Sequence, residues 1–222
     1  MSFKKLLHLR NMAGMIFLIM VMSGCSKNVT QRTIAYFNDF ENDSSFHLSV
    51  YGAGGRIDTS TIAIFNNNKV LGRFRDNSVH LKLDSLPRHN VVKIEFDLYL
   101  HDNWKGNFLA PGSQFPDIWQ MKLNNNPVTV TTFSNDTNPQ SFPGNYQPNM
   151  INNPALANSW GVFPGVCAKQ NISNGTSWYK MEYFTGYLSS LELIFQDVNF
   201  SAGDICSKSW SIDNLKITAI YN

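Results

Sequence analysis

Hydrophobic and polar residues alternate along much of the chain, and residues 91–100 give the clearest example. The even-numbered positions from 92 are apolar: Val92, Ile94, Phe96, Leu98 and Leu100. The odd-numbered positions between them carry polar groups: Lys93, Glu95, Asp97 and Tyr99. Successive side chains of a β-strand point to opposite faces of its sheet. The pattern therefore predicts a strand with one buried and one polar face, and residues 79–83 repeat it.

Further strands are predicted at residues 118–123, 128–133, 178–184, 188–196 and 210–220, with clusters of Gly, Pro and Asn between them. No segment after residue 25 has a sustained helical period. We therefore predict an all-β chain that folds as an antiparallel β-sandwich of jelly-roll-like topology, with its first and last strands adjacent. Residues 135–175 are rich in Asn, Pro and Gly, which predicts long loops that are either functional or disordered.

The N-terminal segment follows a different pattern, in which Lys4, Lys5 and Arg10 precede an apolar run at residues 12–22. That run is about half of the ~20 residues that a membrane-spanning helix needs. A basic region, a short apolar run and then small residues are typical of a secretory signal peptide.

The residues that end this segment, Ser23 and Gly24 directly before Cys25, resemble the lipoprotein box of bacteria. The resemblance implies that Cys25 is acylated and becomes the first mature residue. The protein would then lie in the cell envelope, lipid-anchored to a bacterial membrane, with its domain outside the cytoplasm. The predicted organisation is a signal peptide at residues 1–24, a lipidated cysteine and tether at 25–33 and a β-sandwich domain at 34–222. The alternative is an ordinary signal peptide beside a chance cysteine.

Removal of the signal peptide changes the charge of the chain. The whole sequence has 18 basic and 16 acidic side chains, and three of the basic ones lie within residues 1–24. The mature chain is therefore close to neutral. It offers no cationic field for nucleic acid, so we exclude that class of partner.

Apart from Cys25, the mature chain has two cysteines, Cys167 and Cys206. Both lie in turn-rich segments of an exported protein, where a pair of cysteines favours a disulfide. Two unpaired thiols are the alternative.

Several blocks of the sequence resemble a recurrent exported bacterial β-sandwich domain that has no established activity. The blocks are residues 86–100, 102–106, 116–119, 131–135, 203–204 and 210–217. Residues 37–41 and 212–215 separately resemble the terminal strands of galactose-binding-like carbohydrate-binding modules. In those modules the termini pair, and an acidic residue from each often helps to hold a structural calcium. The resemblance implies Glu41 and Asp213 as calcium ligands.

Five tryptophans raise the possibility of stacking against sugars, because a flat aromatic face suits the apolar face of a pyranose. Trp119 and Trp210 lie within predicted strands and are expected in the core. Trp104 and Trp160 lie in predicted loops and are the candidate ligand-binding residues.

Carboxylates supply two further candidates. Glu95 and Asp97 share a strand face, as the paired acids of a glycoside hydrolase require. Their segment partly resembles the catalytic strand of laminarinase-like glycosidases, but Leu100 stands where that family has a second glutamate. A solvated strand face is therefore favoured. Asp102, Asp117 and Asp204 end predicted strands, where they either bind calcium or cap turns.

Together these features predict a membrane-anchored lipoprotein whose domain is a non-catalytic binding module, with a glycan as its ligand and calcium as a structural ion. A laminarinase-like hydrolase and a structural or assembly lipoprotein without a small ligand remain as alternatives, since sandwiches host all three.

Overall fold

The computed structural model describes residues 29–222 apart from residues 44, 53, 58–60, 151 and 202. The predicted signal peptide and Cys25 lie outside the described residues. Residues Arg32–Tyr221 form one compact unit. All of the secondary-structure elements in the described residues are β-strands. Within the same residues, no helix has the length and apolar character needed to cross a membrane.

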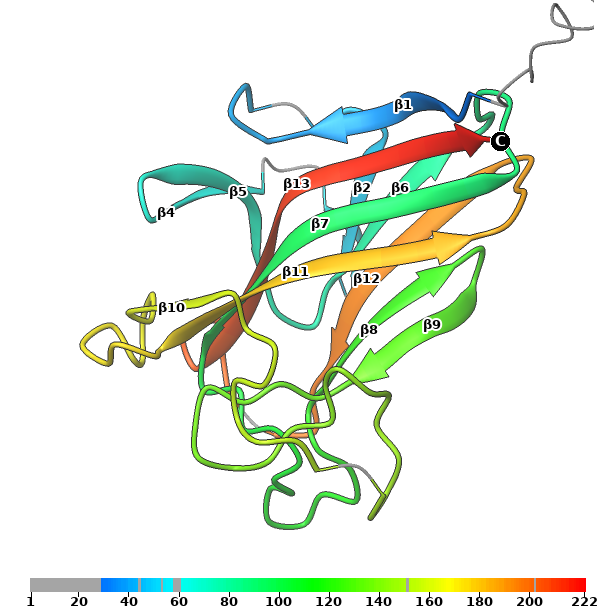
Figure 1. Cartoon of the computed structure of the whole chain (residues 1–222). Helices are drawn as coiled ribbons and strands as arrows, with labels where there is room; N and C mark the ends of the chain where they lie inside the picture. Colours follow the sequence, from blue (N-terminus) through cyan, green and yellow to red (C-terminus); the bar gives the residue numbers. More distant parts are fainter. Residues whose placement is uncertain (1–28, 44, 53, 58–60, 151, 202) are drawn as a thin grey trace, which may run out of the picture. The chain divides into compact units, whose positions relative to one another are not determined.

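Two antiparallel sheets lie face to face (Figure 1). In the described part of the chain, seven strands form the first sheet: β1 (Gln31–Asn38), β4 (Ile62–Phe65), β5 (Asn68–Phe74), β7 (Val91–Asp102), β10 (Gly161–Phe163), β11 (Thr176–Thr185) and β13 (Lys208–Tyr221). Six strands of the same residues form the second: β2 (Leu48–Gly52), β3 (Gly55–Ile57), β6 (Ser78–Leu83), β8 (Ile118–Leu123), β9 (Asn126–Thr131) and β12 (Leu191–Val198).

The strand order is β10–β11–β7–β13–β5–β4 in the first sheet, with β1 paired to β13, and β3–β2–β6–β12–β8–β9 in the second. The predicted sandwich is confirmed, and its first and last strands are adjacent as expected. β1 begins at Gln31, within the residues 25–33 predicted as lipidated cysteine and tether, and the boundary at residue 34 stays a prediction.

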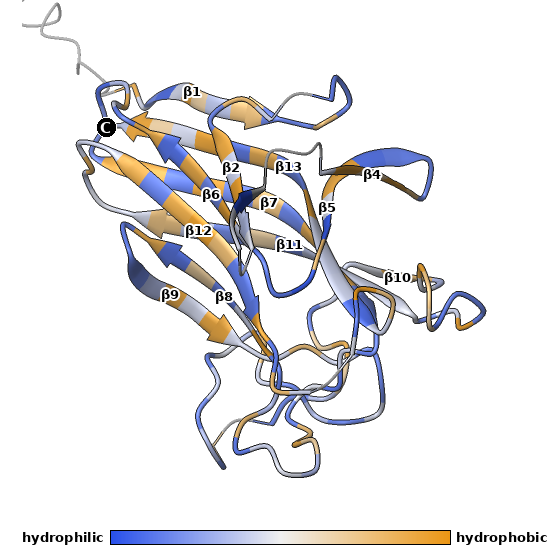
Figure 2. Ribbon diagram, turned by 180° about the vertical axis from the view of Figure 1, so that it is seen from behind, coloured by the Kyte–Doolittle hydropathy of each residue, from blue (hydrophilic) through white to orange (hydrophobic). Residues whose placement is uncertain are grey.

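The core lies between the two sheets, and the predicted alternation decides which side chains enter it. Val92, Ile94 and Phe96 of β7 are at most 3% exposed. Figure 2 shows hydrophobic and hydrophilic positions alternating along the strands of the second sheet. Trp119 and Trp210 are fully buried, with ring centroids 6.3 Å apart, which confirms the prediction that they belong to the core.

The long segment at residues 135–175 contains one strand, β10, among its described residues, as its composition predicted. Buried amides hold this segment to the sandwich. The Asn135 Nδ2 group donates to the carbonyl oxygen of Leu100 at 2.7 Å, and the Gln140 Oε1 atom accepts the N–H of Ser134 at 3.0 Å. Both amide side chains are at most 1% exposed. The described part of this segment is therefore packed structure, and the disordered alternative is wrong.

Cys167 and Cys206 form a disulfide with Cα atoms 5.1 Å apart. The bond joins the segment at residues 135–175 to the chain just before β13. It confirms the favoured pairing over two unpaired thiols.

We expect the folded mature protein to keep both cysteines unreactive toward alkylating reagents in the absence of reductant, as intact mass spectrometry would show. A protein with Ser at both positions should lose about 3–4 kcal/mol of unfolding free energy in urea, because the bond closes a loop of 39 residues in the unfolded chain. Alkylation of both cysteines in folded, unreduced protein would contradict the pairing.

Candidate functional site

The strand-end aspartates Asp102, Asp117 and Asp204 have one role in common. Each accepts hydrogen bonds from two backbone N–H groups at 2.7 to 3.1 Å. Asp204 accepts from Cys206 and Ser207 and so caps a local turn, as the turn-capping interpretation predicts. Asp102 and Asp117 instead accept from loops distant in sequence, which ties those loops to the strand ends.

Trp104 is not a ligand-binding residue, which corrects the sequence analysis. Its side chain is fully buried, and its indole N–H donates to the carbonyl oxygen of Ser209 at 2.8 Å. The loop after β7 folds back onto the sandwich, where the Gly106 N–H donates to the Phe133 carbonyl oxygen at 2.7 Å. Position in a loop therefore does not expose Trp104, and no face of its ring is open to a sugar.

Trp160 is 65% exposed and fits the predicted role. Its backbone N–H donates to the carbonyl oxygen of Trp178 at 2.7 Å, which fixes the start of β10 against β11. The Lys180 ammonium group lies 4.6 Å from the centroid of the Trp160 ring. Trp160 stands beside an open groove of about 470 Å³, here called the Trp160 groove, which residues of β1, β7, β11 and β13 also line.

The lining of the Trp160 groove combines aromatic and polar groups. It includes Phe37, Glu95, Asp97, Trp160, Lys180 and Asn214. Phe37 is 52% exposed, so the groove has a second accessible aromatic ring. Cross-strand register supplies the polar groups, since Lys180 lies opposite Asp97 and Glu182 lies opposite Glu95. Groups of this kind orient polar ligands on a mostly preformed surface.

Glu95 and Asp97 are held by different partners. The Lys93 ammonium group contacts Glu95 at 2.8 Å and Glu182 at 2.5 Å, and both acids raise the pKa of that lysine. Asp97 accepts from the indole N–H of Trp178 at 3.0 Å and from the side-chain amide of Asn214. These contacts are those of a charged, hydrogen-bonded strand face.

Asp213 lies opposite Asp97 in the pairing of β7 with β13 and is fully buried. Its carboxylate accepts from the Asn68 side-chain amide at 2.7 Å and from the Asn214 N–H at 2.7 Å. Burial raises the pKa of Asp213 to about 7, and the negative charges of Asp97 and Glu41 add to the effect.

Calcium at Glu41 and Asp213 stays a prediction. The Glu41 Oε1 atom accepts the N–H of Lys69 at 3.0 Å. No group of three or more His, Cys, Asp or Glu side chains within the described ranges is arranged to hold a metal ion.

The raised pKa of Asp213 predicts a pH-dependent stability. Between the ordinary value of 3.8 and about 7, the folded state keeps a proton that the unfolded state has lost. This group therefore lowers the unfolding free energy as pH rises through that window. Urea denaturation at pH 5 and at pH 8 measures how much the unfolding free energy falls between the two pH values. In Asp213→Asn this fall should be smaller than in the native protein by roughly 1–3 kcal/mol.

The exposed carboxylate of Asp84 provides the control. Asp84→Asn should leave the pH profile as it is, and an unchanged profile in Asp213→Asn would refute the assignment. If added calcium raises the unfolding free energy of the native protein at pH 8 but not that of Asp213→Asn, the predicted calcium site is supported.

Sequence reasoning did not single out several residues of the Trp160 groove, among them Phe37, Lys180 and Asn214. Lys180 lies two positions after Trp178 in a strand that was predicted, so its shared face with Trp178 was available from the period of that strand. Asn214 has a positive φ of 52° next to a register shift in β13, and no sequence period marks that bulge.

Comparison with known proteins identifies no family. No family model matches the chain, and no curated protein matches it. Among solved structures, it is similar to a carbohydrate-binding module, CBM51, from Clostridium perfringens in complex with methyl-galactose. The identity is 8%, the match covers 86% of this chain and 92% of that one, and the TM-score is 0.30.

A second similar structure is a family GH115 4-O-methyl-α-glucuronidase described as specific for decorated arabinogalactans. Its identity is 10% and its TM-score is 0.30, and the match covers 78% of this chain but only 17% of that one. The chain thus corresponds to a small part of that enzyme. Similarity at this level carries no argument about the ligand of this protein, which must come from its own surface.

Proposed function

We propose that this protein binds carbohydrate through the Trp160 groove and does so as a non-catalytic module. The observation that carries the proposal is a tryptophan that is 65% exposed beside an open groove lined with polar side chains. An exposed indole gives a sugar ring a large apolar contact at low entropic cost.

The polar lining of the groove suits the hydroxyl groups of a sugar. Lys180 can donate, and Asp97 and Glu95 can accept. An open groove also suits a stretch of a longer glycan better than a single enclosed sugar. The Lys180 ammonium group over the Trp160 ring places a donor next to the proposed stacking surface.

The test is a glycan array on the soluble domain, followed by calorimetry with the glycans that bind. Trp160→Ala should weaken binding about tenfold or more, as truncation of a central aromatic contact does. Tyr187→Ala is the matched control, because Tyr187 is 71% exposed and does not line the groove. Equal losses in the two variants would refute the groove as the binding site.

The same assay separates the alternatives. Release of sugar that Glu95→Gln abolishes would favour the hydrolase. Absence of both binding and release, with a protein partner that co-purifies, would favour the structural or assembly role.

We further propose that lipid on Cys25 anchors the domain to a bacterial membrane. The support is the sequence before Cys25, with its basic start, short apolar run and small residues. More than one acyl chain on the cysteine would give durable attachment, whereas a single chain gives only marginal binding.

Labelled palmitate should enter the wild-type protein in a bacterial host and be absent from Cys25→Ala. Cys25→Ala should also move the protein from the membrane fraction to the soluble fraction. Label that persists in Cys25→Ala would refute the anchor.

A further inference from the structure

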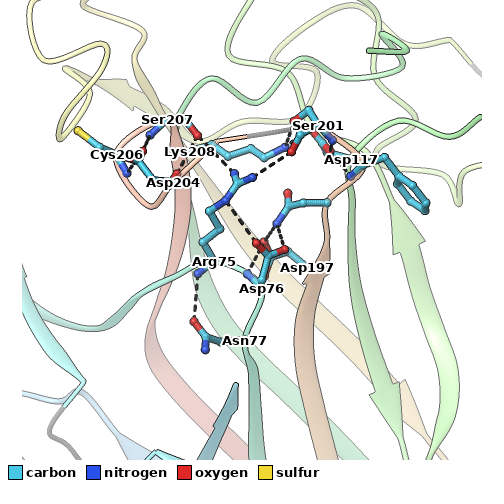
Figure 3. Close-up of polar contacts among 12 residues, drawn as sticks. Arg75, Asp76, Asn77, Asp117, Asp197, Ser201, Asp204, Cys206, Ser207 and Lys208 are labelled. Atoms are coloured by element: carbon cyan, nitrogen blue, oxygen red, sulfur yellow. Dashed lines mark hydrogen bonds and ion pairs between the residues drawn. The ribbon is translucent and has the colours of Figure 1, made fainter. Parts of the chain in front are cut away.

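A second cavity, here called the Lys208 pocket, is lined by residues of the β7–β8 and β12–β13 connections and by Lys208 at the start of β13. Figure 3 shows the polar contacts of Asp117, Ser201 and Lys208. It has a volume of about 330 Å³ and shares no lining residue with the Trp160 groove. One wall is apolar and includes Phe108, Pro111 and Phe115. The other is polar and includes Asp117, Ser201 and Lys208.

The polar wall is built around a buried ion pair. Lys208 has a side-chain exposure of 2%, and its ammonium group contacts the carboxylate of Asp117 and donates to the Ser201 hydroxyl at 2.7 Å. Asp117 also accepts the N–H groups of Phe200 and Ser201 and the Ser201 hydroxyl, at 2.6 to 2.9 Å. Asp117 is therefore fully engaged within the protein, and its charge is balanced by Lys208.

Contacts within the protein hold Ser201 and Ser207 in place. Arg75 donates to the Ser201 carbonyl oxygen at 3.0 Å and to the Ser207 hydroxyl at 3.4 Å (Figure 3). Gly203 has a φ of 146°, and a Cβ atom there would lie 2.2 Å from the Ser207 Oγ atom. The Cys206 disulfide holds the same segment from the other side. A wall anchored in this way costs little ordering entropy when a ligand binds.

The pocket carries excess positive charge. Lys105 lines it and is exposed, with its ammonium group 5.3 Å from the centroid of the Phe108 ring. No carboxylate of the described residues forms an ion pair with Lys105. Burial lowers the pKa of Lys208, and the positive charges of Arg75 and Lys105 act in the same direction. Lys105 therefore stands at the rim as a cation that no carboxylate of the described residues pairs with.

We propose that the Lys208 pocket binds a uronate, which is a sugar-sized ligand with one carboxylate, either free or as the end unit of an acidic polysaccharide. Lys105 pairs with the carboxylate, and Phe108 and Phe115, which are 45% and 41% exposed, contact the ring. The enclosed volume suits one sugar unit. A bare phosphate or sulfate would leave the aromatic wall unused.

The experiment is calorimetry on the soluble domain with galacturonate and with galactose, which differ at the carboxylate. Galacturonate should bind about tenfold more tightly at low salt, and the preference should shrink as salt rises. Lys105→Ala should remove the preference, and Phe115→Ala should weaken both sugars. Lys82→Ala is the control, since Lys82 is an exposed lysine away from the pocket.

Three results would overturn the proposal: no binding of galacturonate, equal affinity for the two sugars, or a preference that survives Lys105→Ala. Inorganic phosphate that competes as well as galacturonate would do the same, by revealing a general anion site. Trigalacturonate distinguishes a free uronate from the end unit of an acidic polysaccharide as the ligand. A site for the chain end would bind trigalacturonate at least as tightly as it binds galacturonate. If galacturonate still binds Trp160→Ala but no longer binds Lys105→Ala, its site is the Lys208 pocket. This result does not depend on whether the Trp160 groove binds a glycan.

Discussion

The pairing of β13 with β7 is the constraint on which the rest of the structure depends. The two strands run side by side at the centre of the first sheet, from the Lys208–Asp102 pair to the Ile220–Val91 pair. Their inner faces supply much of the core. Their outer faces bring Asp97 and Asp213 together beneath the Trp160 groove, and the first residue of β13 places Lys208 in the wall of its pocket. Both candidate sites therefore depend on one register.

This register also determines how unfavourable the interactions among the polar residues near the sites are. A carboxylate opposite a carboxylate in neighbouring strands is unfavourable. Burial raises the pKa of Asp213, and the negative charge of Asp97 opposite it adds to the effect. The bulge after Asp213 turns the Asn214 amide toward Asp97, at 2.8 Å. One irregular residue thus adds a donor to those that Trp178 and Asn68 already provide to the two acids. A sheet optimised only for stability would not need this arrangement.

The sequence predicted those parts of the fold in which the alternation of apolar and polar residues decides whether a side chain is buried or exposed. The β7 and β8 segments alternate over their whole length, and they were placed to within two residues. The strands β2 to β5 and β10 were not predicted. β3 and β10 have only three residues each, and β4 and β5 contain adjacent apolar residues in place of a regular alternation. The disulfide was predicted from the cysteine count and the expectation of export, neither of which depends on the geometry of the fold.

The sites were harder to predict, because they depend on long-range contacts. Trp104 and Trp160 both follow turn-rich sequence, yet one is fully buried and the other is 65% exposed. The difference arises from where each loop packs, and no local pattern reports that. Lys208 likewise reads as an ordinary strand-end lysine until the fold places Asp117 and Ser201 beside it.

The Lys208–Asp117 pair bears on function through its energetics. A buried ion pair costs desolvation energy that the attraction barely repays, and well-packed apolar residues often replace such a pair without loss of stability. Stability alone therefore gives no reason to place Lys208, at 2% exposure, in a pocket whose other wall is apolar. A polar ligand gives one, since a fixed cation and fixed hydroxyl groups at a cavity need no reorganisation to bind it. The same reasoning applies to Asp97 under the Trp160 groove. In both places the protein tolerates an unfavourable polar group beside an accessible aromatic ring, and this combination is what recognition of a sugar requires.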